Sequence, residues 1–412
     1  MEIQCPSSLF TARLSQPPSC LQFLPNEPAY LVIGTYLLSE ETEDDTVVAQ
    51  RKTGSLQLWY LDTEQETLVQ INDARIDLPY AVFDLKFHPW KKHLLGVAGS
   101  NASVSLYSVS PGTEYPAFKL LWKIDAHENS DRGALFLAWT PRDWLPCAGD
   151  QDEEGFALTF ADGRTSVFTT QQHSMEGSSP DDLQQASFIP RESIETWFIA
   201  LESYTTAVGG ERTSYMFTGN DFGALQTRRF SHQQVEDAGD MSLEERQILF
   251  LDDQARHHTA GVTSILPLPL SSLVRDAPIL LTGSYDEYLR VYHATPPRGK
   301  ILAEQRLGGG VWRLNLLSSR VASDDRAIET RLVILASCMH AGARVVEIVW
   351  RSATTEDVGE WTIRVLAQFT EHESMNYASD VYRPGDQGNG SIFVVSSSFY
   401  DKRLCLWKVD IS

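Results

Sequence analysis

The sequence predicts an all-β protein, a seven-bladed β-propeller. The first observation is a repeated phrase. Residues 280–292 (LLTGSYDEYLRVY) read as a strand, a tight turn that contains an Asp, and a second strand that ends in an aromatic residue. The phrase returns at residues 393–407 and, less regularly, at residues 216–226. The second observation is the length, because seven blades of roughly 40–45 residues with insertions use nearly all of the 412 residues. Both observations are typical of WD40-type propellers.

The blades follow one another in chain order, and their strands are separated by turns rich in Gly, Asn or Asp. In the first four blades we expect strands at Cys20–Leu24, Tyr30–Thr35, Ser55–Tyr60, Ala81–Phe87, Leu94–Gly99, Ser103–Val109, Phe118–Ile124, Ala134–Trp139, Phe156–Phe160, Thr165–Thr169, Glu195–Leu201, Met216–Phe217 and Ala224–Arg228. The strands of blades five to seven are centred on Val262–Leu266, Ile279–Tyr292, Val311–Leu316, Leu332–Val349, Tyr377–Tyr382 and Ile392–Trp407.

The last blade lacks its fourth strand. Only Lys408–Ser412 follow Trp407, which is too short a segment for another strand. Ser8–Leu14 alternates like a strand and has no partner of its own near the start of the chain. We therefore expect this N-terminal strand to pair with the last blade and to close the propeller.

Three insertions interrupt an otherwise single propeller domain that spans residues 1–412. The acidic segment Ser39–Gly54 is expected to be a solvated or disordered loop. Gln171–Gln185 is polar and is expected to be a linker or a long surface loop. Ser231–Arg256 is the third insertion, and Met241–Leu251 within it could form a short amphipathic helix.

Composition limits the class of partner and the compartment. The formal net charge of −21 argues against direct binding of nucleic acid or of an anionic membrane and favours a basic or cationic partner, although it could also serve solubility alone. The five cysteines (Cys5, Cys20, Cys147, Cys338 and Cys405) are scattered and form no CxxC motif, so neither a disulfide framework nor a zinc site is indicated. No signal peptide or membrane-length apolar run is present. We expect a monomeric cytoplasmic protein without a cofactor.

Candidate functional residues fall on two classes of loop. In a propeller, the turn between the two middle strands of a blade and the loop that leads into each inner strand lie on the same rim, and function concentrates on such loops. The leading loops contain His258–Gly261, Gly308–Trp312 and His372–Tyr377. The middle turns contain Asp221, Tyr285-Asp286-Glu287, Cys338-Met339-His340 and Phe399-Tyr400-Asp401.

A structural role is the alternative for several of these residues. Turn aspartates and the His of a leading loop commonly form hydrogen bonds inside a blade, which could account for Asp286, Asp401 and His258. His340 differs, because it takes approximately the turn position at which the neighbouring blades carry Asp286 and Asp401. An imidazole suits proton transfer near neutral pH, so His340 is the first catalytic candidate.

Motifs of common enzyme classes are missing. The sequence contains no GxSxG elbow, HExxH helix, P-loop or strand-linked GxGxxG. The run Gly308–Gly310 is not followed by a helical pattern and is only a weak nucleotide signal. From the chemistry of the residues alone, an interaction scaffold is the default.

Several phrases nevertheless resemble the diphthine methyl ester hydrolases, a WD-repeat family of diphthamide biosynthesis. They are HTAGVTSI, TGSYDEYLRVY, GGGVWRLN, ASCMHAG, SFYDKRLCLW and the spaced His372, Ser374, Tyr377 and Asp380. The resemblance covers about Glu195–Trp407. Two departures concern blades four and seven: Arg228-Arg229 replaces the usual Trp-Asp pair, and Asp380-Val381-Tyr382 replaces an expected Asp-Trp pair.

The resemblance implies hydrolysis of a methyl ester on the modified histidine of elongation factor 2, so that the freed carboxylate can be amidated by another enzyme. The family has also been labelled a methyltransferase, but this sequence offers no methyl-donor site. Ester hydrolysis requires an activated nucleophile and an oxyanion donor. His340 or His372 could activate water, or Ser374 or Cys338 could be acylated, with Asp380 or Asp286 orienting a His. Arg313 and the amides of Gly309-Gly310 are candidate oxyanion donors.

The resemblance also implies a cationic substrate, because the modified histidine carries a trimethylammonium group. Aromatic faces and acidic side chains favour such a cation. The candidate binding residues are His258, Tyr285, Asp286, Glu287, Trp312, Arg313, Tyr377 and Asp380, with Tyr400 on the same rim. Packing between blades is the alternative for the aromatic residues, above all for Trp312. The expected partner is elongation factor 2 carrying methylated diphthine.

Overall fold

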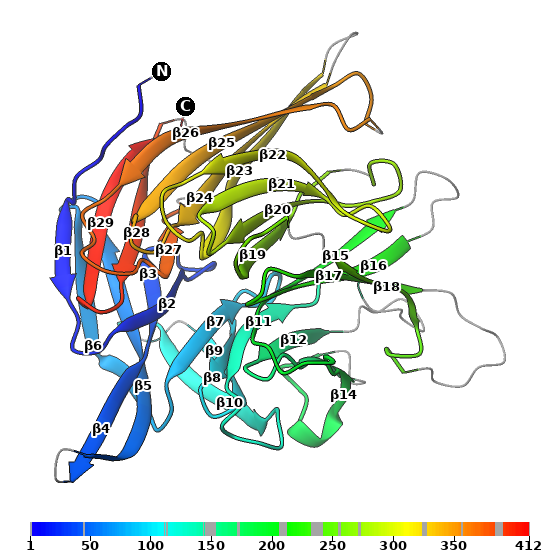
Figure 1. Cartoon of the computed structure of the whole chain (residues 1–412). Coiled ribbons are helices and arrows are strands. Elements are labelled where there is room, and N and C mark those ends of the chain that lie inside the picture. The colour runs from blue at the N-terminus through cyan, green and yellow to red at the C-terminus, as the bar shows by residue number, and fades with distance from the viewer. Residues whose placement is uncertain are drawn as a thin grey trace. The chain divides into compact units, whose positions relative to one another are not determined.

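Figure 1 shows a computed structural model of the chain, which is built almost wholly of β-strands. The structure describes residues 2–43, 46–110, 112, 114–142, 144, 154–170, 174–205, 212–231, 242–253, 257–270, 273–323, 328–355, 357–383 and 390–411. Within these residues the helical structure is limited to one 3₁₀ turn, Pro180–Asp182.

The described strands form seven sheets, one for each expected blade. Blade one consists of β2 (Pro18–Phe23), β3 (Tyr30–Thr35), β4 (Leu37–Glu43), β5 (Thr46–Asp62) and β6 (Thr67–Leu78). Blade two consists of β7 (Val82–Phe87), β8 (Leu94–Gly99), β9 (Ser103–Ser110) and β10 (Ala117–Asp125). Blade three consists of β11 (Ala134–Trp139), β12 (Gly155–Phe160), β13 (Thr165–Thr170) and β14 (Leu183–Phe188).

Blade four consists of β15 (Thr196–Thr205), β16 (Arg212–Asn220), β17 (Leu225–Ser231) and β18 (Gln247–Asp253), and blade five of β19 (Val262–Pro267), β20 (Ile279–Ser284), β21 (Tyr288–His293) and β22 (Lys300–Arg306). Blade six consists of β23 (Arg313–Ser323), β24 (Ile328–Ser337), β25 (Ala343–Ser352) and β26 (Glu360–Phe369). Blade seven consists of β27 (Ala378–Val381), β28 (Ser391–Ser398), β29 (Arg403–Asp410) and β1 (Phe10–Arg13). Seven successive meander sheets define a seven-bladed β-propeller, as the sequence predicts.

The chain divides into two compact units. Unit 1 comprises Met1–Leu137, Ser337–Arg344 and Leu366–Ser412, and it contains blades one, two and seven with the middle turn of blade six. Unit 2 comprises Ala138–Ala336 and Val345–Val365, with blades four and five and most of blades three and six. The extent of a single domain over residues 1–412 stays a prediction.

The N-terminal strand completes blade seven. Strand β1 lies antiparallel to β29, with Phe10 opposite Leu406 and Arg13 opposite Arg403 (Figure 1). Closer to the terminus, the Gln4 amide N–H donates to the Leu366 carbonyl at 2.9 Å, and its side-chain Nε2 donates to the Asp410 carbonyl at 2.8 Å. The closure predicted for Ser8–Leu14 is therefore confirmed.

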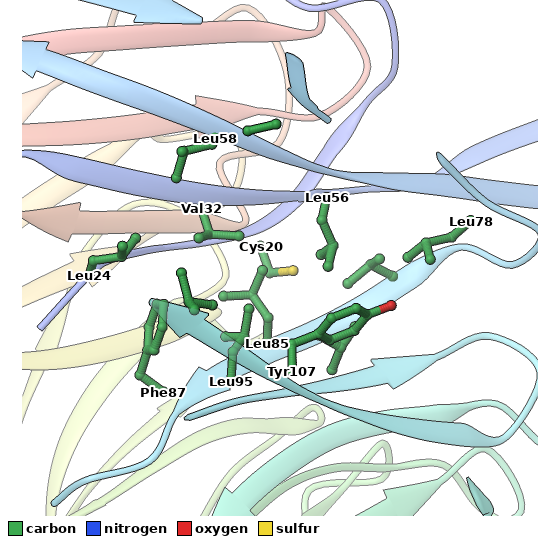
Figure 2. Packing of buried hydrophobic residues seen from close by; sticks show 14 of the residues in the cluster. Cys20, Leu24, Val32, Leu56, Leu58, Leu78, Leu85, Phe87, Leu95 and Tyr107 are labelled. Atoms are coloured by element: carbon green, nitrogen blue, oxygen red, sulfur yellow. The ribbon is translucent and has the colours of Figure 1, made fainter. Parts of the chain in front are cut away.

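The core of unit 1 follows from the two-residue period of its strands. In β3, Val32 joins the cluster between blades one and two, together with Leu56, Leu85 and Leu95 (Figure 2). The flanking residues Leu31 and Ile33 join a second cluster that contains Leu404 and Leu406 of blade seven. Because successive side chains point to opposite faces, one strand fills the interfaces with both neighbouring blades.

One expected loop is a pair of strands, and another ends in a strand. The acidic segment forms a β-hairpin, in which Leu38 pairs with Lys52 and Ser39 with Arg51. This pairing extends β5 beyond the blade, where β-branched Thr46 and Val47 favour extended backbone. The polar segment Gln171–Gln185 contains the 3₁₀ turn and the start of β14, while its residues 171–173 lie outside the described part.

The expected helix within Met241–Leu251 is wrong. Its second half belongs to β18, which pairs with β17. Ile248 and Phe250 alternate with less exposed residues along β18, and this period of two was mistaken for a helical spacing. Position 241 itself lies outside the described residues.

Deletion of residues 2–13 is expected to destabilise the protein strongly. It removes the four residue pairs between β1 and β29 and the packing of Phe10 and Ala12, with an expected loss of at least about 2–3 kcal/mol in the free energy of unfolding. The bare edge of β29 should also promote aggregation. Urea unfolding measures the change, with deletion of residues 2–3 as the control. Equal stability of the two deletion variants would contradict the closure.

Candidate functional site

The turn between the second and third strand has one backbone geometry in blades two to seven. The N–H of its last residue donates to the carbonyl three residues earlier, and that last residue has a positive φ angle. The positive-φ residues are Ala102, Gly163, Gly223, Glu287, Gly342 and Lys402. Because this geometry repeats, the positive-φ residue is a common reference position from which the turns of different blades can be compared.

His340 is an exposed residue of the turn in blade six. It lies two residues before Gly342, as Tyr285 lies two before Glu287 and Tyr400 two before Lys402. His340 therefore corresponds to the two tyrosines and not to Asp286 and Asp401. The sequence alignment was one residue off, because Ala341 takes the Asp position in blade six and the sequence does not show where the positive φ falls.

Three loops of unit 1 lie side by side around His340. The Asn376 N–H donates to the Met339 carbonyl at 3.0 Å, which joins the turn of blade six to the loop that leads into blade seven. The Phe399 N–H donates to the Met375 carbonyl at 3.0 Å, which joins that loop to the turn of blade seven. Arg344 is buried and donates from Nη1 to the Ala341 carbonyl at 2.7 Å, so it fixes the turn that carries His340.

The turn carboxylates serve the blades. Asp286 accepts hydrogen bonds from the Thr259 N–H at 2.9 Å and from Arg290 Nη1 at 2.9 Å. Burial alone would raise the pKa of Asp286, but these hydrogen bonds, together with one from the Tyr288 N–H, hold the pKa below its usual value. This pattern favours the structural alternative for Asp286.

Asp401 repeats the pattern in blade seven and engages Ser374. It accepts from the Glu373 N–H at 3.2 Å and from Ser374 Oγ at 3.1 Å. Ser374 Oγ in turn accepts from the Tyr400 N–H at 2.9 Å. Because its hydroxyl is both donor and acceptor within the loop, Ser374 is placed to fix the turn rather than to attack a substrate.

Two of the candidate histidines are buried and bonded inside their blades. His258 Nε2 lies 2.8 Å from Thr282 Oγ1, and His372 Nε2 lies 2.8 Å from Ser396 Oγ, which also accepts from Trp407 Nε1. Burial lowers the pKa of His258 to about 3 and that of His372 to about 4. Both are neutral at physiological pH, and each ties the loop that leads into its blade to the second strand of that blade.

Cys338 and Asp380 also face the interior. Cys338 has no exposed surface, and burial raises the pKa of its thiol to about 12, so the reactive thiolate is scarce at neutral pH. Asp380 on β27 accepts from the Phe23 N–H at 2.9 Å and thereby ties blade seven to blade one. Burial raises the pKa of Asp380.

The binding candidates of unit 2 form an aromatic group. The ring of Tyr285 lies 6.2 Å from that of Trp197 and 5.9 Å from that of Trp312, and Trp197 donates from Nε1 to Asp221 at 2.6 Å. The Arg313 guanidinium lies over the Trp312 ring at 4.6 Å. Glu287 accepts from Arg306 Nε at 2.8 Å. Gly309 and Gly310 are buried in the loop that leads into β23.

A second aromatic group lies in unit 1, and three of its five members were singled out from the sequence. Phe399 is at its centre, with its ring centroid 5.0 Å from Tyr400, 5.5 Å from Tyr377 and 5.8 Å from Tyr36. Phe83 extends the group, 5.6 Å from Tyr36. Sequence reasoning missed Tyr36 and Phe83 because they come from blades one and two, far from the other three in the chain. The five residues are called the tyrosine cluster below.

Within the described part of the chain, no group of three or more His, Cys, Asp or Glu side chains is arranged to hold a metal ion. None of the described helical segments has the length and apolar character that a membrane crossing requires.

No protein-family model matches the chain. Similarity to individual proteins extends over almost its whole length. The chain is 26% identical over 378 residues to diphthine methyltransferase of Schizosaccharomyces pombe, covering 92% of this chain and 90% of that protein. It is 22% identical to the diphthine methyltransferase homolog of Dictyostelium discoideum, over 96% of this chain and 98% of that protein. Diphthine methyltransferase of Saccharomyces cerevisiae is 23% identical, over 99% of both chains.

Solved structures show the same fold class, the WD-repeat β-propeller. Sqt1 from Chaetomium thermophilum, bound to the N-terminus of a ribosomal protein, superposes with a TM-score of 0.55 at 16% identity, over 98% of this chain and 100% of that chain. Sqt1 from Saccharomyces cerevisiae gives a TM-score of 0.53 at 10% identity, over 98% and 100% of the two chains. Within this class, the named relatives confirm the resemblance to the diphthine methyl-modifying WD-repeat family that the sequence motifs indicate.

The buried state of His372 predicts loss of stability in acid. Its pKa is near 6.5 in the unfolded chain and about 4 in the folded chain, so between these values the unfolded state binds more protons. The free energy of unfolding should therefore fall as pH drops from 6.5 to 4, by about 3 kcal/mol from this group, with little further change from it below pH 4.

The His372→Gln variant tests this assignment. Gln has no titration in this range, so the stability of the variant, measured by urea unfolding at several pH values, should depend less steeply on pH than that of the unmodified protein. Parallel curves for the two proteins would show that His372 is accessible to protons in the folded state.

Proposed function

We propose that the protein hydrolyses the methyl ester of methylated diphthine on elongation factor 2, which frees a carboxylate for amidation to diphthamide. The observation that carries the proposal is the exposed imidazole of His340, whose turn is held by the Met339–Asn376 hydrogen bond beside the loop that carries Tyr377. The relatives support the substrate, because their names state action on diphthine. The activity is proposed for the cytoplasm, with a monomeric protein.

Water is the proposed nucleophile. His340 takes one proton from water as the water oxygen attacks the ester carbonyl, and the imidazolium returns the proton to the methoxide that leaves as methanol. Ester and water thus become carboxylic acid and methanol. Direct acylation is disfavoured, because Cys338 is a buried thiol and Ser374 is bonded to Asp401 and to the Tyr400 N–H.

The oxyanion requires a hydrogen-bond donor close to the base. Tyr377 follows Asn376, the residue that is bonded to the turn of His340. Burial raises the pKa of the Tyr377 phenol to about 12, and a side-chain hydrogen bond with Tyr400 adds to the shift, so the hydroxyl stays protonated; donation to the oxyanion requires it to exchange this partner for the substrate. Tyr377 is therefore the proposed donor in unit 1; Arg313 and the amides of Gly309-Gly310, in unit 2, stay as predicted alternatives.

Hydrolysis is preferred to methyl transfer for two reasons. The imidazole on the rim suits proton transfer to and from water. The sequence contains no strand-linked GxGxxG motif. The alternative function is a non-catalytic WD-repeat scaffold. The similarity to Sqt1, described bound to the N-terminus of a ribosomal protein, favours this alternative.

Methanol release separates the two functions. Purified protein is expected to release methanol from elongation factor 2 that carries methylated diphthine, without added metal or nucleotide. Binding of the factor with no methanol would favour the scaffold.

The His340→Ala variant tests the base. Because His340 is exposed, the variant should fold normally and bind elongation factor 2, while kcat should fall by about 10²–10⁴-fold. The matched control is Ser374→Ala, which removes the hydroxyl of a second catalytic candidate, in the adjacent loop. It should lower the melting temperature and leave kcat nearly unchanged. A folded His340→Ala variant with normal turnover would rule out this base.

A further inference from the structure

The tyrosine cluster (Tyr36, Phe83, Tyr377, Phe399 and Tyr400) has the arrangement of a ligand surface rather than of a core. Tyr400 is 67% exposed, and the other four rings are half-buried. Phe399 packs edge-on against Tyr400 and Tyr377, with interplanar angles of 83° and 66°. Phe399 fills the centre of the group, and the exposed ring of Tyr400 at its edge is open to solvent, where an aromatic ring attracts a cation.

The electrostatics of this surface favour a positive charge. Asp401 follows Tyr400 directly, and although burial alone would raise its pKa, hydrogen bonds from Ser398, the Glu373 N–H and Ser374 hold the pKa below its usual value. Arg403 is paired with Glu373 at 2.5 Å, and its Nε lies farther from the Asp401 carboxylate, at 3.8 Å. Several Lys and Arg side chains among the described residues lie over aromatic rings. The rings that they cover do not include those of Tyr36, Phe83, Phe399 and Tyr400.

The aromatic group of unit 2 differs in this respect. Arg313 lies over Trp312 at 4.6 Å and within 5.5 Å of the Phe198 ring. Its guanidinium is positively charged at any pH that the protein meets, so a second cation at the same ring face would be repelled. The Trp197 indole N–H also donates to Asp221, so this carboxylate is already hydrogen-bonded.

We propose that the tyrosine cluster of unit 1 is a binding site for a quaternary ammonium group and that Tyr400 is its outer wall. The inference rests on the proposed function in that the trimethylammonium of the substrate would occupy the site while the ester lies near His340. It reassigns cation recognition away from Tyr285 and Trp312, and it adds Tyr36 and Phe83, which the sequence did not single out.

The test measures binding without hydrolysis. Choline carries the quaternary ammonium group, and 3,3-dimethyl-1-butanol has the same shape without the charge. Titration of the full chain, followed by ligand-observed NMR or calorimetry, should show choline binding at least about tenfold more tightly than the neutral alcohol. Equal binding of the two ligands would show a merely apolar surface and would overturn the proposal.

Variants locate the site. Tyr400→Leu keeps the size of an apolar side chain without the ring quadrupole and should weaken choline binding about tenfold, whereas Tyr400→Phe should retain it. Tyr285→Leu, at the equivalent turn position of blade five, is the matched control and should bind choline normally. Weakening by Tyr285→Leu and not by Tyr400→Leu would place the cation in unit 2 and overturn the proposal.

The outcome is independent of the hydrolysis assay, because choline contains no ester. If choline binds as expected but no methanol is released from the modified factor, the cation site stands and the hydrolase proposal fails. If methanol is released and choline binding is unaffected by Tyr400→Leu, the hydrolase stands and this assignment fails.

Discussion

The structure depends on one constraint: each blade has to bury both of its faces. A sheet in a sandwich can leave one face in water, but β3 sends Val32 into one cluster and Leu31 and Ile33 into another. A single blade would expose one of these clusters and could not be stable by itself. Rigidity at the rim follows from this, because the turns are anchored at both ends in strands that have little freedom to move.

That rigidity allows one turn geometry to carry different chemistry. The residue two positions before the positive-φ residue is a Tyr in blades five and seven and a His in blade six. The residue between them is the structural Asp in blades five and seven, where it fastens the turn to the preceding loop. In blade six the fastening is done by backbone and by Arg344 instead, and the exposed position is left to an imidazole. Scaffold and candidate chemistry are thus assigned to adjacent positions of the same turn.

The sequence predicted the strands that a local apolar pattern determines, and it missed the features that depend on contacts between distant parts of the chain. Second strands such as β20 and β28 are buried on both faces over most of their length, so they stand out as apolar runs. The need for a closing strand followed from the short segment after Trp407. Outer strands such as β22 and β26 have one exposed face and weaker alternation, and they were not predicted. At the site, the register of His340 needed backbone angles, and the tyrosine cluster needed Tyr36 and Phe83 to be brought to Phe399 by the fold. Spacing in the chain contains neither kind of information.

The pairing of β1 with β29 also bears on how the chain is made. Thr11 and Cys405 are 394 residues apart in the sequence, yet they lie opposite each other in one ladder. A ribosome that adds about 5–20 residues per second needs roughly 20–80 s to pass from one to the other. During that time the first strand is out in solution while its partner does not yet exist, with an unpaired edge and apolar Phe10 exposed. The first strand of the chain is thus the last to find its place, because its edge stays unpaired until the final blade has been made.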